Sequence, residues 1–401
     1  MNPATHDFPA DPVAAVTHAD PYPYYAALRE GPPLAWNDTL RLWVASRADV
    51  VEQVLQAHAV LRVRPAAEPV PRAIVGSAAG EVFGHLVRMN DGAAHQAHRP
   101  ALQRALAGLD LNAVRDAALQ VAQRVPAQQA LSDTLFSVPV QTVAHLLGFD
   151  DDALPQVERW MRDFVACLSP LSTPEQLQQA SAAAGALMTR FEVLVAGATP
   201  RHGTLLAGVM NGTMAGALAD ALADGSAEGA APSRSLLANL VGLLSQTCDA
   251  SAGLLGNSLV ALVREPALRA AARTRDGLQA VVEETARHDP PVHNTRRFVA
   301  EPVTLAGTPL AAGDAVLVLL ASANRDASFN PDPDRFMRVR ARRRMLGFGH
   351  GMHACPGQAL ACTLAAAGLE ALLCRAPDLD ALRQRGWRYR PSVNTRIPLF
   401  H

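Results

Sequence analysis

The fold is decided by one ten-residue stretch near the end of the chain, Phe348-Gly349-His350-Gly351-Met352-His353-Ala354-Cys355-Pro356-Gly357. Glycine lets a backbone pass close to a large planar group or adopt positive φ, where a side chain would clash. Cys355 stands directly before a helix-forming segment, and Pro356 suits the first turn of a helix. Because a helix N-terminus offers amide donors and positive potential, it favours the thiolate over the thiol. The stretch therefore predicts a tight loop that presents a thiolate to a metal, although a lone cysteine is more often a buried structural residue.

The composition is that of a globular protein without a dominant charge. Of the 401 residues 49% are hydrophobic and 18% charged, and the net charge of −1 argues against a partner chosen by charge alone, such as nucleic acid. Length alone would allow two or three domains. The five cysteines show no C-x-x-C pair, which argues against a disulfide framework or a zinc site and fits a reducing cytoplasm. They are Cys167, Cys248, Cys355, Cys362 and Cys374.

Two segments bear on targeting. Met1–Asp20 lacks a basic start followed by an apolar run, so no signal peptide is expected. The candidate membrane span is Leu236–Val263, but a mid-span acid is costly in lipid, and a long helix inside a globular protein is expected instead. Four polar residues interrupt that span: Asn239, Gln246, Asp249 and Asn257.

The pattern Phe348-Gly349-x-Gly351-x-His353-x-Cys355-x-Gly357 resembles the haem-binding signature of the cytochrome P-450 family. The resemblance implies a mainly α fold, with a large helical region around haem b and a small β-rich lobe. It implies a single P-450 domain over residues 1–401. It also makes Cys355 the iron ligand and places Phe348, Gly349 and Gly357 against the haem.

Further haem contacts follow from the same resemblance. His95 and Arg99 are four residues apart and share a helix face, like the family's H-x-x-x-R pair that binds the haem propionates. Pro100 is expected to bend that helix. Arg297, in the predicted strand Thr295–Phe298, and His353 complete a set of donors around two buried carboxylates.

A helix from about Ser235 to Arg264 resembles the family's central helix, which passes over the iron. Counting back along it, the family's small-Gly-x-acid-Thr becomes Gln246-Thr247-Cys248-Asp249-Ala250, followed by Ser251. Asp249 keeps the acid, but Ala250 has no donor or acceptor where a threonine is expected to order water. Four explanations stay open. Ser251, Thr247 or Gln246 organises the water; a substrate hydroxyl or amide does so; the reaction needs no full proton relay; or the register is shifted by one residue.

A structural cluster is expected behind the cysteine loop. Glu284 and Arg287, three apart on a helix, resemble the family's E-x-x-R motif, and Pro333-Asp334-Arg335-Phe336 resembles its P-x-R-F. The resemblance makes Arg335 the third member of a buried ion cluster that fixes the loop. Breaking such a cluster would cost roughly 3–5 kcal/mol.

The substrate pocket is placed by resemblance alone. Val292, His293 and Asn294 should line it, together with Thr395 in the segment Asn394–Ile397. Cys167–Pro174 falls near the family's mobile lid, and Asp220–Ser235 predicts a flexible connector. In the irregular loop before the His95 helix, three arginines could meet a substrate carboxylate or be merely solvated: Arg62, Arg64 and Arg72.

A basic run directly before the cysteine loop bears on partners: Arg338, Arg340, Arg342, Arg343 and Arg344. It is either a solvated edge or a docking patch for an acidic electron donor of the ferredoxin or flavodoxin type. Because 401 residues leave no room for a reductase, electrons from NAD(P)H would arrive through that partner. A cytoplasmic monomer without nucleic-acid or membrane partner is expected.

The function implied by the resemblance is a haem-thiolate monooxygenase. It would hydroxylate or epoxidise a small organic molecule, as in natural-product tailoring, with dioxygen and two electrons. Thiolate ligation favours cleavage of the O–O bond. The alternatives are oxidative coupling or peroxide-driven oxidation on the same haem, and a haem-binding sensor without turnover.

Overall fold

The computed structural model describes residues 8–197, 205–211 and 233–400. They form two compact units, each built from separate stretches of the chain. The first, here the β unit, comprises Met1–Ala66, Ala252–Cys355 and Leu372–His401. The second, here the helical unit, comprises Ala67–Ser251 and Pro356–Ala371. The single domain expected over residues 1–401 stays a prediction, and most of the predicted connector Asp220–Ser235 lies outside the described residues.

The β unit is built on a five-stranded sheet with strand order β1-β2-β7-β4-β3. β2 and β7 are parallel, and the other neighbours are antiparallel. Two hairpin-like pairs, β5 with β6 and β8 with β9, complete the strands. The strands are β1 Leu34–Asn37, β2 Leu42–Ala45, β3 Leu61–Arg62, β4 Asn294–Val299, β5 Val303–Leu305, β6 Thr308–Leu310, β7 Ala315–Leu319, β8 Trp387–Tyr389 and β9 Pro398–Phe400.

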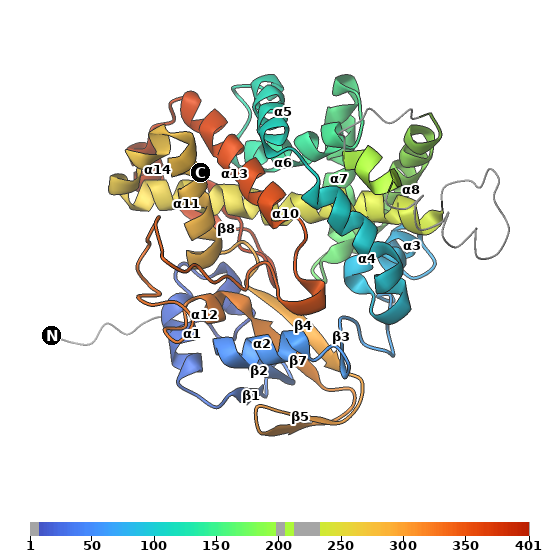
Figure 1. Ribbon diagram of the computed structural model, residues 1–401, viewed down its shortest axis with the longest axis vertical. Helices are drawn as coiled ribbons and strands as arrows, with labels where there is room; N and C mark the ends of the chain where they lie inside the picture. Colours follow the sequence, from blue (N-terminus) through green and yellow to red (C-terminus); the bar gives the residue numbers. More distant parts are fainter. Residues whose placement is uncertain (1–7, 198–204, 212–232, 401) are drawn as a thin grey trace. The chain divides into compact units, whose positions relative to one another are not determined.

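The sequence of β7, Ala-Val-Leu-Val-Leu, is apolar throughout because both faces of the sheet are covered. Val316 and Val318 point to the face on which α2 packs, and Leu317 and Leu319 point to the face of α1. α2 lies along the sheet beside β2 and β7 (Figure 1). The helices of this unit are α1 Tyr22–Arg29, α2 Ala48–Gln56, α11 Arg275–His288, α12 Leu320–Asn324 and α14 Leu379–Arg385, with short 3-10 turns η1 Ala14–Thr17, η5 Pro266–Leu268, η6 Ala271–Arg273 and η7 Gly351–His353.

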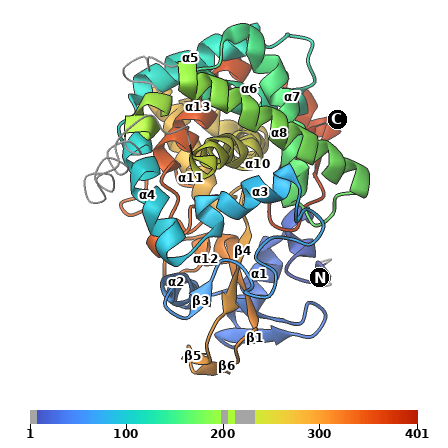
Figure 2. The same cartoon turned by 90° about the vertical axis from the view of Figure 1, so that its right-hand side faces the viewer.

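The helical unit contains helices in the region Leu109–Leu205, where they were expected. The expectation that Arg62–Arg88 is irregular throughout is wrong, because α3 Ala78–His85 and a 3-10 turn lie within it. α7 and α8 run side by side (Figure 2), and α5 packs on α6. α4 continues through Pro100, and the predicted break near Cys167–Pro174 is a 3-10 turn and a short irregular segment. The elements are α3 Ala78–His85, η2 Val87–Met89, α4 Gly92–Ala107, α5 Leu111–Arg124, α6 Leu131–Leu146, η3 Asp151–Ala153, α7 Leu154–Phe164, η4 Val165–Leu168 and α8 Pro174–Gly197.

Two helices carry the chain from one unit into the other, α10 Arg234–Arg264 and α13 Gln358–Cys374. α10 has 31 residues, which confirms the predicted long helix. Two of the polar residues that interrupt its apolar sequence are structural. Asn239 donates to the carbonyl of His85 and accepts from the amide of Val87, and Asn257 donates to the carbonyls of Asp289 and Arg396.

Among the described residues, one helical stretch is long and apolar enough to cross a membrane. It is Gly351–Cys374, with a mean hydropathy of 1.5, and half of it is buried inside the protein. The sequence-based candidate Leu236–Val263 is therefore not the segment that meets this criterion. A buried core helix has the same length and composition, so the finding says little about location.

Candidate active site

The cysteine loop is a cradle of backbone in which two glycines have left-handed conformations. Gly349 has φ +73° and Gly351 has φ +69°. A Cβ on Gly349 would lie 3.3 Å from the carbonyl oxygen of His353, so this turn has little room for a side chain. The amide of Cys355 donates to the carbonyl of Phe348 at 2.7 Å, which closes the loop. Cys355 is exposed and forms no disulfide, as the predicted ligand requires.

The loop is held against α2 and the end of α12. A Cβ on Gly351 would lie 3.1 Å from the carbonyl oxygen of Leu55 in α2, so the loop has little room for a side chain at position 351. The side chains of Gln56 and His350 are hydrogen-bonded at 2.6 Å. Just before the loop, the amide of Leu346 donates to the buried side chain of Asn324 at 2.6 Å. These contacts fix both arms of the loop relative to the sheet.

A buried ion cluster stands behind this loop, centred on the carboxylate of Glu284. Glu284 and Arg287 are both fully buried, and the Arg287 Nη2 lies 2.7 Å from Glu284 Oε1. The same carboxylate accepts from Arg340 Nε at 2.8 Å and from Arg343 Nε at 3.1 Å. Burial alone would raise the pKa of Glu284, but hydrogen bonds from Arg287 hold it below its ordinary value.

The prediction that Arg335 is the third member of this cluster is wrong. Its carbonyl oxygen points inward and accepts from Arg287 at 3.2 Å and from Arg340 at 2.6 Å. With the backbone turned this way, the Arg335 side chain is exposed. Arg340 and Arg343 take the place expected for it. Sequence reasoning missed both because it treated them as part of a surface run.

Two of the five arginines in the basic run before the loop belong to the buried Glu284 cluster. Besides Arg340 and Arg343, Arg344 pairs with Glu52 at 2.9 Å and its guanidinium lies over the ring of Phe329. Arg338 and Arg342 are exposed. Arg340 and Arg343 are therefore not available to a docking patch, and the exposed arginines of the run are Arg338, Arg342 and Arg344.

A second buried cluster, here the Asp289 cluster, occupies the place predicted for part of the substrate pocket. Asp289 Oδ1 accepts from the Tyr22 hydroxyl at 2.6 Å and lies 3.0 Å from Arg396 Nε. His293 is fully buried; one ring nitrogen is 3.0 Å from the Tyr25 hydroxyl and the other 3.6 Å from Asp289. Its side chain is committed to this core cluster, so its assignment to the pocket lining is wrong.

Of the other predicted pocket residues, one is committed to the protein core and two are not. The buried Asn294 side chain donates to the carbonyl of Val393 at 2.9 Å, so it ties two chain segments together instead of facing a substrate. Val292 and Thr395 face each other across an isolated β-bridge. Val292 is only partly buried. The role of Val292 and Thr395 in substrate binding stays a prediction.

Charge and burial shift the acid–base groups of the Asp289 cluster. Burial would raise the pKa of Asp289, but the guanidinium of Arg396 holds it far below its ordinary range. Burial lowers the pKa of His293 to about 4. Burial, reinforced by Arg325, lowers the pKa of His288 to about 3. At neutral pH the cluster therefore holds a carboxylate, two guanidinium groups and two neutral imidazoles.

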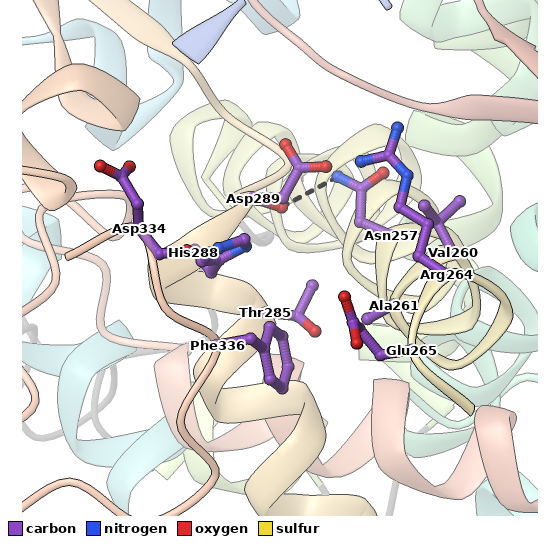
Figure 3. A pocket seen from close by; sticks show the side chains of 10 residues that line it. All are labelled: Asn257, Val260, Ala261, Arg264, Glu265, Thr285, His288, Asp289, Asp334 and Phe336. Atoms are coloured by element: carbon purple, nitrogen blue, oxygen red, sulfur yellow. Dashed lines mark hydrogen bonds between the residues drawn. The ribbon is translucent and has the colours of Figure 1, made fainter. Parts of the chain in front are cut away.

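A small cavity lies beside this cluster, between the end of α10, α11 and the segment around Phe336 (Figure 3). Its volume of about 130 Å³ is well below the roughly 300–1,000 Å³ of small-molecule sites. The buried side-chain oxygen of Asn257 accepts no hydrogen bond from the described residues, which suits a polar solvent site. The lining residues are Asn257, Val260, Ala261, Arg264, Glu265, Thr285, His288, Asp289, Asp334 and Phe336.

The predicted haem-carboxylate donors are distributed over both units. In the helical unit, α4 carries the buried His95 and the part-buried Arg99. In the β unit, the buried Arg297 lies on β4 and donates to the carbonyl of Arg296 at 2.8 Å, and His353 lies in η7. For all four residues, binding of the haem carboxylates stays a prediction. Phe348 and Gly357, part-buried at the two ends of the loop, do so too.

The residues around the missing threonine lie on α10 in the helical unit. Thr247 donates its hydroxyl to the carbonyl of Leu244 at 2.7 Å, and the Gln246 amide donates to Gly242 at 2.9 Å. Ser251 is buried, whereas Gln246 is exposed. Asp249 and Ala250 are part-buried. Both Thr247 and Gln246 thus already use a donor on their own helix, and their catalytic role stays a prediction, as do those of Asp249, Ala250 and Ser251.

Comparison with known proteins places this geometry in a family. Residues 275–375 match the family "Cytochrome P450". The chain is 43% identical over 152 residues to "Cytochrome P450 monooxygenase PikC" of Streptomyces venezuelae, an alignment that covers 37% of this chain and 36% of PikC. Alignments with the first curated relatives cover 36%, 65% and 61% of those relatives' lengths, less than two thirds in each case.

Solved structures match over nearly the whole chain. The structure of CalO2 has a TM-score of 0.76 and 26% identity, and the match covers 97% of both chains. A complex of P450BioI with an acyl carrier protein ligated to hexadec-9Z-enoic acid also has a TM-score of 0.76, at 21% identity, over 95% of this chain and 97% of that one. The fold is thus the predicted P450 fold. The family match, the curated relatives and these structures together support a bacterial-type cytochrome P450.

The Glu284 cluster yields a matched pair of substitutions. Arg340→Met leaves a buried carboxylate with one fewer partner and should lower the free energy of unfolding by about 3–5 kcal/mol. Arg335→Met removes an exposed side chain and should change it by less than about 0.5 kcal/mol. Denaturant titration of both variants measures this. Equal losses, or a larger loss for Arg335→Met, would contradict the assignment of Arg340.

The two buried neutral histidines predict acid sensitivity. Because the pKa of His293 falls from 6.5 to about 4 on folding, the unfolded chain binds protons more readily, and stability is lost as pH falls from 6.5 towards 4. His288, with its pKa lowered from 6.5 to about 3, acts in the same direction. Each histidine should contribute up to about 1.4 kcal/mol per pH unit in that window.

Unfolding titrations at several pH values test this. His293→Gln should flatten the dependence between pH 6.5 and 4, the interval set by its ordinary and folded pKa values. His58→Gln, at an exposed position, is the control and should leave it as in the unmodified protein. An unchanged slope in His293→Gln would show that the buried imidazole does not set the acid limit.

Proposed function

We propose that the protein is a haem-thiolate monooxygenase that oxidises a small organic molecule with dioxygen and two electrons from a separate donor. The observation that carries this proposal is the cysteine loop. It combines an exposed cysteine, two glycines with positive φ and a backbone turn with little room for a side chain. A flat tetrapyrrole needs close backbone approach on one side and a thiolate directed at its centre, and the loop has the residues for both.

The chain's own residues would hold haem b as follows. Cys355 would ligate the iron, and thiolate-bound haem supplies O–O bond cleavage when dioxygen and electrons are available. His95, Arg99, Arg297 and His353 would neutralise the two haem carboxylates, because buried carboxylates need charged or hydrogen-bonding partners. Phe348, Gly349 and Gly357 would pack against the ring beside the thiolate.

Electrons would reach the haem from a ferredoxin or flavodoxin-type donor that is itself reduced at the expense of NAD(P)H. The exposed Arg338, Arg342 and Arg344 are the part of the basic run that could contact an acidic donor. We propose a cytoplasmic, monomeric enzyme without a nucleic-acid or membrane partner. Support comes from the near-neutral charge of the chain and from the bacterial origin of its relatives.

The substrate is proposed to be an intermediate of natural-product biosynthesis. Relatives named for such chemistry support this, including PikC and a cyclomarin C epoxidase of Salinispora arenicola that is 39% identical over 128 residues. Hydroxylation or epoxidation are the reactions proposed.

A second candidate reaction is favoured by Ala250. Its methyl group cannot hold water, and Thr247 and Gln246 already donate to carbonyls of their own helix. With no hydroxyl at position 250, proton delivery would have to come from Asp249, Ser251 or the substrate. Oxidative coupling or peroxide-driven oxidation demands less of such a relay. A haem-binding sensor without turnover is the remaining alternative.

The thiolate assignment is tested by exchanging cysteines in the haem-loaded protein. The unmodified protein should give the long-wavelength Soret band of thiolate-bound ferrous–CO haem, and Cys355→Ser should lose it along with oxygenation of any substrate. Cys374→Ser removes another exposed cysteine and should keep both. Retention of the band in Cys355→Ser, or its absence from the unmodified protein, would overturn the proposed function.

A further inference from the structure

Arg88 is a cation in the helical unit for which the described residues provide no counter-ion. It lies in η2, between α3 and α4, and the residue is part-buried. Its Nε has no access to solvent and donates to no acceptor among the described residues. Arginine keeps its proton at any physiological pH, so this group is charged. Burial lowers the pKa of Arg88, which reflects the cost of placing the charge there.

One titratable group among the described residues influences the charge of Arg88, but it does not neutralise that charge. That group is the thiol of Cys167, at the end of η4 in the same unit. Burial raises the pKa of Cys167 to about 12, so the thiol is uncharged at neutral pH. The described residues contain no carboxylate paired with Arg88.

Other buried arginines in this protein show how such a charge is ordinarily satisfied. Arg287 meets Glu284 and three backbone carbonyls. Arg396 lies beside Asp289 and donates to the carbonyls of Val16, His18 and Ala19. An unpaired buried charge costs several kcal/mol, so Arg88 does not stabilise the fold in the way that Arg287 and Arg396 do.

The segment that carries Arg88 is held rigidly. The amide of Val87 donates to Asn239 of α10 at 2.8 Å, and Asn239 donates to the carbonyl of His85 at 3.0 Å. On the other side of Arg88, the Asn90 side chain donates to the carbonyl of Leu86 at 2.8 Å. The backbone on either side of Arg88 is thus held by α10, the helix predicted to pass over the iron, and by Asn90. A cation on a well-held backbone segment, with its Nε cut off from solvent and without an acceptor among the described residues, is suited to receive an anion.

We propose that Arg88 binds a carboxylate, or an anionic group of similar shape, on the substrate. The inference rests on the proposed function and narrows its substrate class to organic acids. The guanidinium would donate two parallel hydrogen bonds to the anion and so fix one end of the substrate in the helical unit.

Two of the three arginines suggested by the sequence, Arg62 and Arg72, are less suited to this role. Arg62 donates to the carbonyls of His58 and Ala59. Arg72 lies 3.5 Å from Glu68, and its side chain is 88% exposed. Neither is both desolvated and unpaired. Arg88 is the last residue of the segment Arg62–Arg88 that contains these arginines. Nothing in the sequence predicts that Arg88 is more buried than the residues around it.

The test uses acid and amide partners of equal shape, dodecanoate with dodecanamide and indole-3-acetate with indole-3-acetamide. Binding to the haem-loaded protein is measured by calorimetry. In the unmodified protein the acids should bind more tightly than the amides. Arg88→Met should weaken the acids about 10- to 100-fold, since a hydrogen bond to a charged group is lost, and leave the amides within about twofold. Arg88→Lys should restore part of the preference, and Arg72→Met should keep all of it.

Thermal unfolding without ligand supplies a second readout, which a merely structural arginine would move in the opposite direction. Because the charge is uncompensated, Arg88→Met should raise the unfolding midpoint or leave it unchanged. A lower midpoint in Arg88→Met, or the same acid-over-amide preference in variant and unmodified protein, overturns the proposal. A loss of haem from Arg88→Met does so too, because the anion would then be a haem carboxylate.

Failure of this inference and failure of the proposed function are distinguishable. The ferrous–CO spectrum with its Cys355→Ser comparison reports the haem-thiolate site and does not depend on Arg88. A normal spectrum without acid preference rejects the organic-acid substrate and keeps the monooxygenase. Acid preference without a thiolate spectrum keeps the anion site and rejects the monooxygenase.

Discussion

The carboxylate of Glu284 is the interaction on which the rest of the candidate site depends. It has no access to solvent and is shared by Arg287, Arg340 and Arg343. Those arginines then donate their remaining hydrogens to carbonyls of the segment before the cysteine loop, including Pro333 and Arg335. A segment without regular secondary structure is thus held in place by hydrogen bonds from these arginines to its carbonyl groups. Taking this carboxylate and its three arginines out of water is costly by itself, so we infer that the cluster is there to fix the position of the loop that carries Cys355.

The last turns of α11 organise two buried clusters at once. Glu284 and Arg287 face the segment before the cysteine loop, while His288 and Asp289, at the helix end, face α1 and the chain's C-terminal strands. Arg325 joins the end of α11 to α1: it donates to the carbonyl of His288 and stacks over the ring of Tyr22 at 3.3 Å. The β unit is therefore braced by polar contacts on both sides of one helix. This explains why so many charged and aromatic residues in it are buried.

The sequence was most informative where a motif fixes local backbone geometry. The cysteine loop, the long helix α10 and the E-x-x-R helix could all be predicted, because glycine spacing, apolar periodicity and i,i+3 pairing are local properties. The third cluster member was missed, because the choice between Arg335 and Arg340 depends on which way a carbonyl turns in an irregular segment. His293 was assigned to the substrate pocket, but its side chain contacts Tyr25 and Asp289 in the core. Tyr25 is far away in the sequence, so this contact could not be predicted. Arg88 carries no motif, and its burial comes only from tertiary structure.

The central claim is that the buried Glu284 carboxylate positions the cysteine loop. Amide hydrogen exchange in Glu284→Gln tests it most directly, with Glu283→Gln as the partner variant because Glu283 contacts Arg343 alone among these arginines and is partly exposed. The account predicts that the amides of Gly349 and Cys355 exchange much faster in Glu284→Gln than in Glu283→Gln, while those of the β5–β6 hairpin are unchanged in both. Equal protection of the Cys355 amide in the two variants would contradict it.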